Sequence, residues 1–139
     1  MGYQTGRAER REIKQMVLRS LSPDREPRWI GKAEVRVDGA TVHVRYCTRA
    51  AKFNINPTTL AADYELWICG TEEHWYLLPN SAVRAMHDHP SAYPDRRNPG
   101  YTVVSVNVHA HQAEYAAPGI ALDLSSYFRR GLRTVGAVA

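Results

Sequence analysis

The dipeptide Asp38-Gly39 constrains this chain most, because it separates two short segments of alternating polarity, residues 33–37 and 41–46. Asp-Gly between two alternating segments predicts a β-hairpin closed by a two-residue type I′ turn. Such a turn fixes the register, so that the numbers of paired residues add up to 77. The predicted pairs are Val35 with Val42 and Ala33 with Val44 on the apolar face, and Glu34 with His43, Arg36 with Thr41 and Lys32 with Arg45 on the polar face.

Further elements are predicted on both sides of this hairpin. Ile13, Met16, Val17 and Leu21 recur at helical spacing, which predicts a helix over residues 6–21 with Thr5 as its cap and the arginines on its other faces. Downstream we expect strands at 53–56, 64–69, 74–78 and 101–108, a weaker strand towards Tyr115, helices at 80–86 and 123–132, and a proline-rich loop at 88–100. This order predicts one α+β or α/β domain over residues 1–139, with a mixed central sheet flanked by helices.

Positive charge is concentrated at the start of the chain. Of its 139 residues, 18 are Lys or Arg and 14 are Asp or Glu; residues 1–36 carry nine basic and five acidic side chains, and the remainder is balanced. Arginine dominates, and its planar guanidinium suits phosphate oxygens, so a nucleic acid is a natural partner. A solvated basic helix explains the same pattern without a ligand.

Several classes of protein are disfavoured by the composition. No apolar segment approaches the ~18 residues of a membrane span, so we expect no membrane partner. The two cysteines, Cys47 and Cys69, have neither metal-binding nor redox spacing. A cytoplasmic protein is therefore expected. No phosphate-binding glycine loop, serine elbow or His-Glu-x-x-His motif is present.

The histidines form two His-x-His pairs, at positions 87 and 89 and at positions 109 and 111. On a strand, His109 and His111 would share one face and could chelate a metal ion with Glu114 nearby. A zinc-dependent hydrolase is therefore one hypothesis for this chain. The same pairs are also explained without a metal, as exposed polar residues at the junctions between elements.

The hairpin sequence from Glu34 to Arg45 resembles the core hairpin of the PD-(D/E)xK (restriction-endonuclease-like) nucleases, particularly small phage and intron-encoded members. The downstream segments 62–70 and 74–79 look similar to the strands that follow in those members. The resemblance covers roughly residues 5–110 and implies a restriction-endonuclease-like fold, DNA as partner, a Mg²⁺-dependent endonuclease activity and a homodimer. It places a catalytic site at Glu34, His43 and Arg45, with Glu9 added from the preceding helix.

The chain departs from the family pattern at the residues that matter for cleavage. Glu34 is a conservative replacement for the family Asp and a candidate metal ligand, but His43 stands where the family has a carboxylate or amide, and Arg45 replaces its lysine. Mg²⁺ prefers oxygen ligands, and arginine cannot act as a general base. We therefore expect a DNA-binding protein whose nuclease site is degenerate, weak or lost. The expected nucleic-acid contacts are Arg7, Arg10, Arg11, Lys14, Lys32, Arg36 and Lys52.

Two alternatives remain open beside this reading and the zinc hydrolase. One is an active Mg²⁺-dependent DNA endonuclease of a phage or mobile element. The other is a protein-interaction module, such as an inhibitor or accessory factor, that keeps a nuclease scaffold for its shape. In a protein without cleavage no cofactor is expected.

Overall fold

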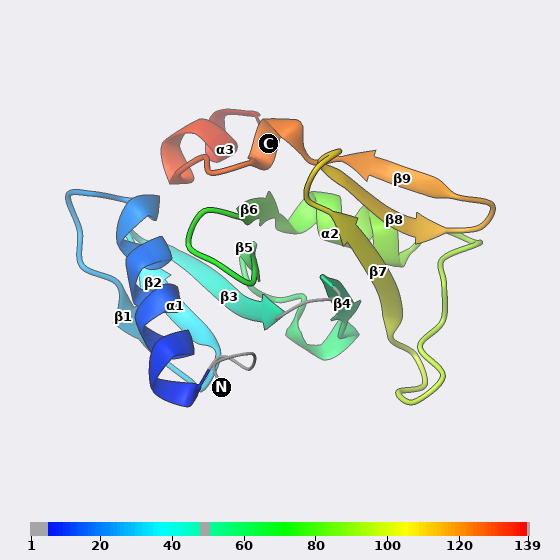
Figure 1. The fold of residues 1–139 in the computed structure, drawn as a ribbon, viewed down its shortest axis with the longest axis horizontal. Helices are drawn as coiled ribbons and strands as arrows, with labels where there is room; N and C mark the ends of the chain where they lie inside the picture. Colours follow the sequence, from blue (N-terminus) through cyan, green and yellow to red (C-terminus); the bar gives the residue numbers. More distant parts are fainter. Residues whose placement is uncertain (1–5, 48–50, 139) are drawn as a thin grey trace.

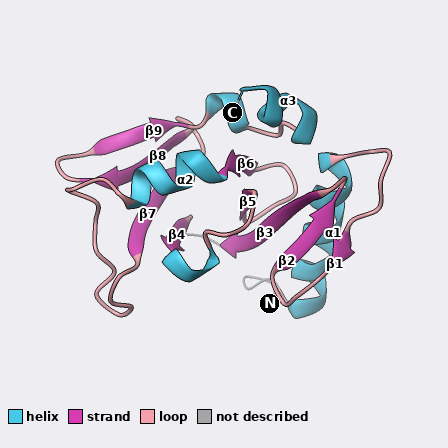
Figure 2. Cartoon of the chain, turned by 180° about the vertical axis from the view of Figure 1, so that it is seen from behind, coloured by secondary structure: helices cyan, strands magenta, loops and turns pink. Residues whose placement is uncertain are grey.

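The structure is a computed structural model that describes residues 6–47 and 51–138. Three helices and nine strands make a mixed α+β architecture, as expected from the sequence (Figures 1 and 2). The helices are α1 (Arg7–Leu21), α2 (Asn80–His87) and α3 (Leu132–Val138), with short 3-10 turns η1 (Pro57–Thr59) and η2 (Ser125–Tyr127). The expected helix cap, Thr5, lies outside the described residues, and Gly6 precedes α1.

Five strands form the first sheet, in the order β1-β2-β3-β5-β6. Their bounds are β1 (Arg28–Trp29), β2 (Glu34–Val37), β3 (Ala40–Cys47), β5 (Tyr64–Cys69) and β6 (Trp75–Pro79). Strands β3 and β5 run parallel, and the other neighbours in this sheet are antiparallel. The expected mixed sheet is therefore present.

A second, four-stranded sheet was not expected. Its order is β4-β7-β8-β9, with every neighbouring pair antiparallel. The bounds are β4 (Lys52–Ile55), β7 (Thr102–Asn107), β8 (Gln112–Ala116) and β9 (Ile120–Asp123). The short apolar segment at β4 was recognised as a strand, but strand propensity does not indicate which partner a strand chooses.

The predicted hairpin between β2 and β3 is confirmed over the pairs from Glu34 to Val37, whereas the predicted pair of Lys32 with Arg45 is not among the paired residues. Val35 pairs with Val42, Glu34 with His43 and Arg36 with Thr41. Asp38 and Gly39 both have positive φ angles, 50° and 82°, as a type I′ turn requires. Ala33 accepts a backbone hydrogen bond from Val44 just before β2 begins.

Each face of the first sheet covers its own apolar core. On one face, the valines of the hairpin pack with Val17, Leu18 and Leu21 of α1 and with Leu132 and Val135 of α3. On the other face, Trp67 and Tyr76 pack with apolar residues of α2 and of the second sheet. Because side chains alternate along a strand, His43 and Arg45 face the second core, away from α1.

The prediction of a helix over residues 123–132 is wrong. The chain there forms β9, the turn η2 and then α3, which begins at Leu132. The side chain of Asp123 accepts hydrogen bonds from the backbone nitrogen and hydroxyl of Ser125, and this local turn competes with helix formation. Phe128 then forms a β-bridge with Tyr76 at the edge of the first sheet.

Candidate nucleic-acid interface

A hollow of about 630 Å³ lies between the first half of α1 and the edge of the first sheet. We call it the cationic groove. Six residues line it: Arg7, Arg10, Arg11, Lys14, Trp29 and Lys32. The structure therefore brings together five of the seven cations expected to contact nucleic acid and adds one tryptophan.

The groove arises because one stripe of α1 changes character along the helix. Residues three, four and seven apart share a face of a helix, so Arg7, Arg10, Arg11 and Lys14 lie on the stripe that continues as Val17, Leu18 and Leu21. The apolar half of this stripe is buried against the sheet. The cationic half extends past it and forms one wall of the groove, with α1 alongside β1 (Figures 1 and 2).

This arrangement corrects the sequence interpretation of α1. We expected Met16 on the buried stripe and the arginines on other faces, whereas Met16 is 50% exposed and Leu18 is fully buried. The four cations are one to three turns ahead of the apolar residues on the same face. Helical spacing shows which residues share a face but does not separate a cationic half of that face from an apolar half, so it did not reveal this division.

Trp29 supplies the opposite wall and is partly exposed. It pairs with Val35 across β1 and β2, and directly paired residues point to the same face of a sheet. Since Val35 packs in the core beneath α1, Trp29 also faces α1. At the sheet edge this core ends, and 38% of the Trp29 surface is exposed.

The charge of the groove is not neutralised by the protein. Within residues 6–47 and 51–138, no ion pair involves a groove cation, and no carboxylate lines the groove. Partial burial, and then the neighbouring charge of Arg10, lower the pKa of Lys14. Arg10 itself lies over the ring of Tyr46, with 5.5 Å between Cζ and the ring centroid. An anion entering the groove would therefore meet partly ordered, uncompensated cations.

The two other expected cations lie elsewhere. Arg36 pairs with Arg28 across β1 and β2, on the sheet face opposite Trp29, and lines a separate hollow. Lys52 begins β4 in the second sheet, where it pairs with Ser105. Neither residue lines the cationic groove.

Two of the four residues expected to be catalytic, Glu34 and His43, form a row with Glu65 across three strands, and most of this row is buried. Glu34 pairs with His43, and His43 pairs with Glu65 of β5. His43 is only 6% and Glu65 only 2% exposed. The nitrogen Nδ1 of His43 lies 3.7 Å from Oε2 of Glu65, and neither atom has a hydrogen-bond partner. The other Glu65 oxygen, Oε1, accepts a 2.7 Å hydrogen bond from Nε1 of Trp67.

Arg45 and Glu9 are not positioned for chemistry with this row. The guanidinium of Arg45 donates to Oδ1 of Asn54 on β4, so it links the two sheets. The amide of Asn54 donates in turn to Asp95, whose pKa is lowered first by the hydrogen bond from Asn98. Glu9 lies in the first turn of α1, which packs on the opposite face of the sheet from His43 and Arg45.

The row does not fit the Mg²⁺ ion that the family resemblance implies. Mg²⁺ binds oxygen ligands in near-ideal octahedral geometry. Here the imidazole of His43 separates the carboxylates of Glu34 and Glu65, and a guanidinium occupies the next position on the same face of β3. In the described part of the chain, no three His, Cys, Asp or Glu side chains are grouped as a metal site.

The expectation that His109 and His111 share a strand face is wrong. Strand β7 ends at Asn107, and both histidines lie in the turn before β8. His111 has a positive φ of 53°, and its Nδ1 shares a 2.8 Å hydrogen bond with the hydroxyl of Tyr76. Its ring also packs on Phe128. His111 therefore fastens this turn to the first sheet.

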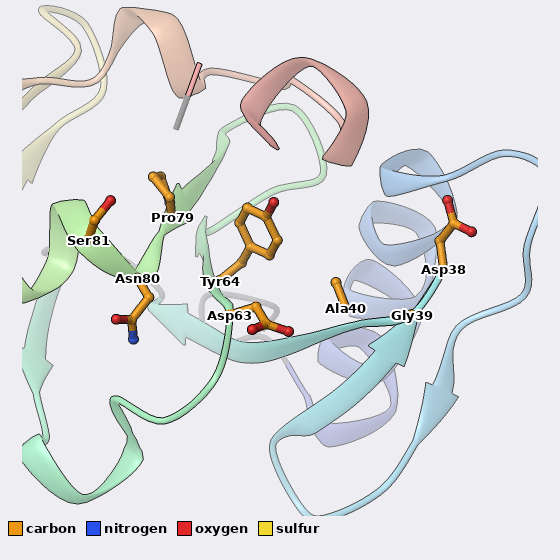
Figure 3. A pocket seen from close by; sticks show the side chains of 8 residues that line it. All are labelled: Asp38, Gly39, Ala40, Asp63, Tyr64, Pro79, Asn80 and Ser81. Atoms are coloured by element: carbon orange, nitrogen blue, oxygen red, sulfur yellow. The ribbon is translucent and has the colours of Figure 1, made fainter. Parts of the chain in front are cut away.

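A second, open hollow lies at the turn of the predicted hairpin (Figure 3). Its two carboxylates already have partners within the protein: Asp63 accepts hydrogen bonds from the backbone nitrogen and hydroxyl of Thr41, and Asp38 lies 3.9 Å from Arg25. Figure 3 shows that the side chain of Asp38 does not point towards that of Asp63. The carboxylates of this hollow therefore connect neighbouring segments of the protein, and they are not free to bind a ligand.

Two residues of these sites were missed in the sequence. Trp29 follows Arg28 in a two-residue strand, too short to show alternation. Glu65 lies in the segment Tyr64–Cys69, whose other central residues are apolar. A charged residue inside such a buried strand was a usable signal, because buried carboxylates are rare without a partner.

No family model, curated protein or solved structure matches this chain. No helix in the described residues is both long and apolar enough to cross a membrane.

Proposed function

We propose that this protein binds nucleic acid and that the cationic groove holds the phosphate backbone. One observation carries the proposal: five cations converge on one groove with no carboxylate among them. Arginine and lysine neutralise phosphates and release the counterions condensed on the nucleic acid, which drives such binding. Charge that a protein leaves uncompensated within a concave surface also steers an anionic ligand towards it.

The hairpin resemblance supports DNA as the nucleic acid and a restriction-endonuclease-like ancestry whose cleavage is weak or lost. Arg45 stands at the position of the family lysine and is held by Asn54. His43 stands at the position of a metal ligand and faces Glu65 from a buried site. Binding and cleavage would thus depend on different residues of this chain, and the cationic groove accounts for binding alone.

Fluorescence anisotropy with labelled oligonucleotides tests the proposal. Arg10→Glu/Arg11→Glu reverses two charges in the groove, whereas Arg96→Glu/Arg97→Glu makes the same change in net charge on an exposed loop far from α1 (Figure 1). With up to five phosphates neutralised, the affinity for duplex DNA should fall with a log–log salt slope of roughly −4 to −5. The groove variant should weaken binding strongly and flatten the slope, and the loop variant should do neither. Equal effects of the two variants, or salt-independent binding, would reject the proposal.

Cleavage is measured on the same preparations. Plasmid incubated with Mg²⁺ or Mn²⁺ should remain unnicked by the wild-type protein. Nicking that disappears in Glu34→Ala would instead identify an active endonuclease.

A further inference from the structure

Resting on the proposed function, we infer that the cationic groove takes single-stranded nucleic acid, with Trp29 stacked on an unpaired base while the surrounding cations hold the flanking phosphates. Proteins that bind single strands combine a positively charged groove with aromatic side chains on which bases stack. Both elements occur here in one hollow.

Trp29 is placed as a platform and not as a core residue. Its pairing with Val35 turns it towards α1, and its position in the outermost strand leaves 38% of its surface exposed. The other two tryptophans, Trp67 and Trp75, are buried. A ring that is held by the sheet on one side and surrounded by cations on the other loses little conformational freedom when a base covers it.

The position of Trp29 inside the groove selects against a duplex. The base faces of a duplex are covered by their neighbours in the stack, so a duplex offers this ring only phosphates and groove edges. An unpaired base can be splayed out and enter a hollow. The groove volume of about 630 Å³ lies in the range of small-molecule sites, which fits one or two nucleotides.

The cations around Trp29 are prepared for phosphate. Arg10 is positioned by the ring of Tyr46, whose hydroxyl donates a 2.8 Å hydrogen bond to the carbonyl of Gly70. Partial burial, and then the charge of Arg10, lower the pKa of Lys14, and a phosphate between these two side chains would offset the repulsion between them. Arg7 and Arg11 extend the same wall along α1, and Lys32 closes the groove beyond β1.

Intrinsic fluorescence gives the first test, because Trp29 is the exposed one of the three tryptophans. An oligothymidylate of about 12 nucleotides, within the range of single-strand site sizes, should quench the wild-type emission. Trp29→Phe should abolish this quenching while retaining most of the binding, since a phenyl ring still stacks. Binding without quenching in the wild-type protein would overturn the inference.

Affinity gives the second test. Trp29→Ala should weaken oligothymidylate binding roughly 5- to 150-fold, the effect of losing one base–aromatic stack, and should change binding to a duplex of the same length less than about twofold. Circular dichroism establishes that both variants are folded. An unchanged affinity in Trp29→Ala, or equal losses for single strand and duplex, rejects the stacking while leaving the proposed function intact, provided that Arg10→Glu/Arg11→Glu still weakens binding. If the charge reversal has no effect on either probe, the proposed function fails first.

Discussion

The buried pair His43 and Glu65 should be one of the most sensitive points of this fold. Their facing atoms are 3.7 Å apart, both are almost completely excluded from water, and neither has another hydrogen-bond partner. His43→Leu removes the nitrogen and leaves the Glu65 carboxylate in the core with only the Trp67 hydrogen bond. Breaking a buried pair in this way costs about 3–5 kcal/mol. That is a large share of the 5–15 kcal/mol typical of a whole domain.

A second substitution separates the effect of the buried charge from that of the lost imidazole. Glu65→Gln keeps an oxygen that accepts from Trp67, and its amide group can donate to His43, so alone it should cost under about 1.5 kcal/mol. In His43→Leu/Glu65→Gln no charge is stranded, and the remaining penalty is one unsatisfied amide, about 1–3 kcal/mol. The double variant should therefore be more stable than His43→Leu, with a coupling energy of roughly −1 to −3 kcal/mol.

Urea-induced unfolding, followed by circular dichroism at neutral pH, measures all three free energies. His109→Leu is the matched control, because His109 is exposed in a turn and its loss should change stability by no more than about 0.5 kcal/mol. Additive effects of the two substitutions would show that the Glu65 carboxylate is not what makes His43 necessary.

Two further predictions concern packing and thiol chemistry. A Cβ on Gly131 would lie 2.8 Å from the carbonyl oxygen of Leu21, so Gly131→Ala should lower the free energy of unfolding by about 1–3 kcal/mol in the same urea titration. Gly31→Ala is the control, because its new atom meets only a 3.8 Å contact and should have little effect. Equal effects would show that α1 and α3 adjust freely at this contact. Burial, with a smaller contribution from Cys47, raises the pKa of the Cys69 thiol to about 12. At about pH 8 a thiol reagent should therefore modify only the partly exposed Cys47 in the folded protein, and both cysteines after unfolding. In the variant Cys47→Ser, Cys69 is the remaining cysteine. If the reagent modified Cys69 in the folded variant as fast as in the unfolded chain, the prediction that burial protects Cys69 would be wrong.

The predictions from sequence succeeded where local chemistry determines the structure. Asp38-Gly39 requires a turn with two positive φ angles, and this turn sets the pairing from Glu34 to His43. Alternation then identified which side chains of the hairpin are apolar. Neither feature says what covers the polar face, on which His43 proved to be buried while Arg36 stays exposed.

Long-range pairing explains most of what could not be predicted. Glu65 reaches His43 through the parallel pairing of β3 with β5, which brings together residues 22 positions apart. The groove likewise depends on the pairing of Trp29 with Val35 and on the packing of α1 against the hairpin valines. Five groove residues were identified by their charge, whereas Trp29 needed the register to be recognised.

The distribution of the N-terminal charge within the fold matters more than its amount. Arg19 and Arg25 lie 3.9 Å from carboxylates, and Arg28 and Arg36 lie on the far face of the sheet. The other five basic residues of the first 36 line a single groove, and no carboxylate is among its lining residues. Arg7, Arg10 and Arg11 are exposed, as the cations of a solvated helix would be, so exposure alone does not distinguish them. Their arrangement does, because they share the stripe of α1 that continues into the core and line one hollow together with Trp29.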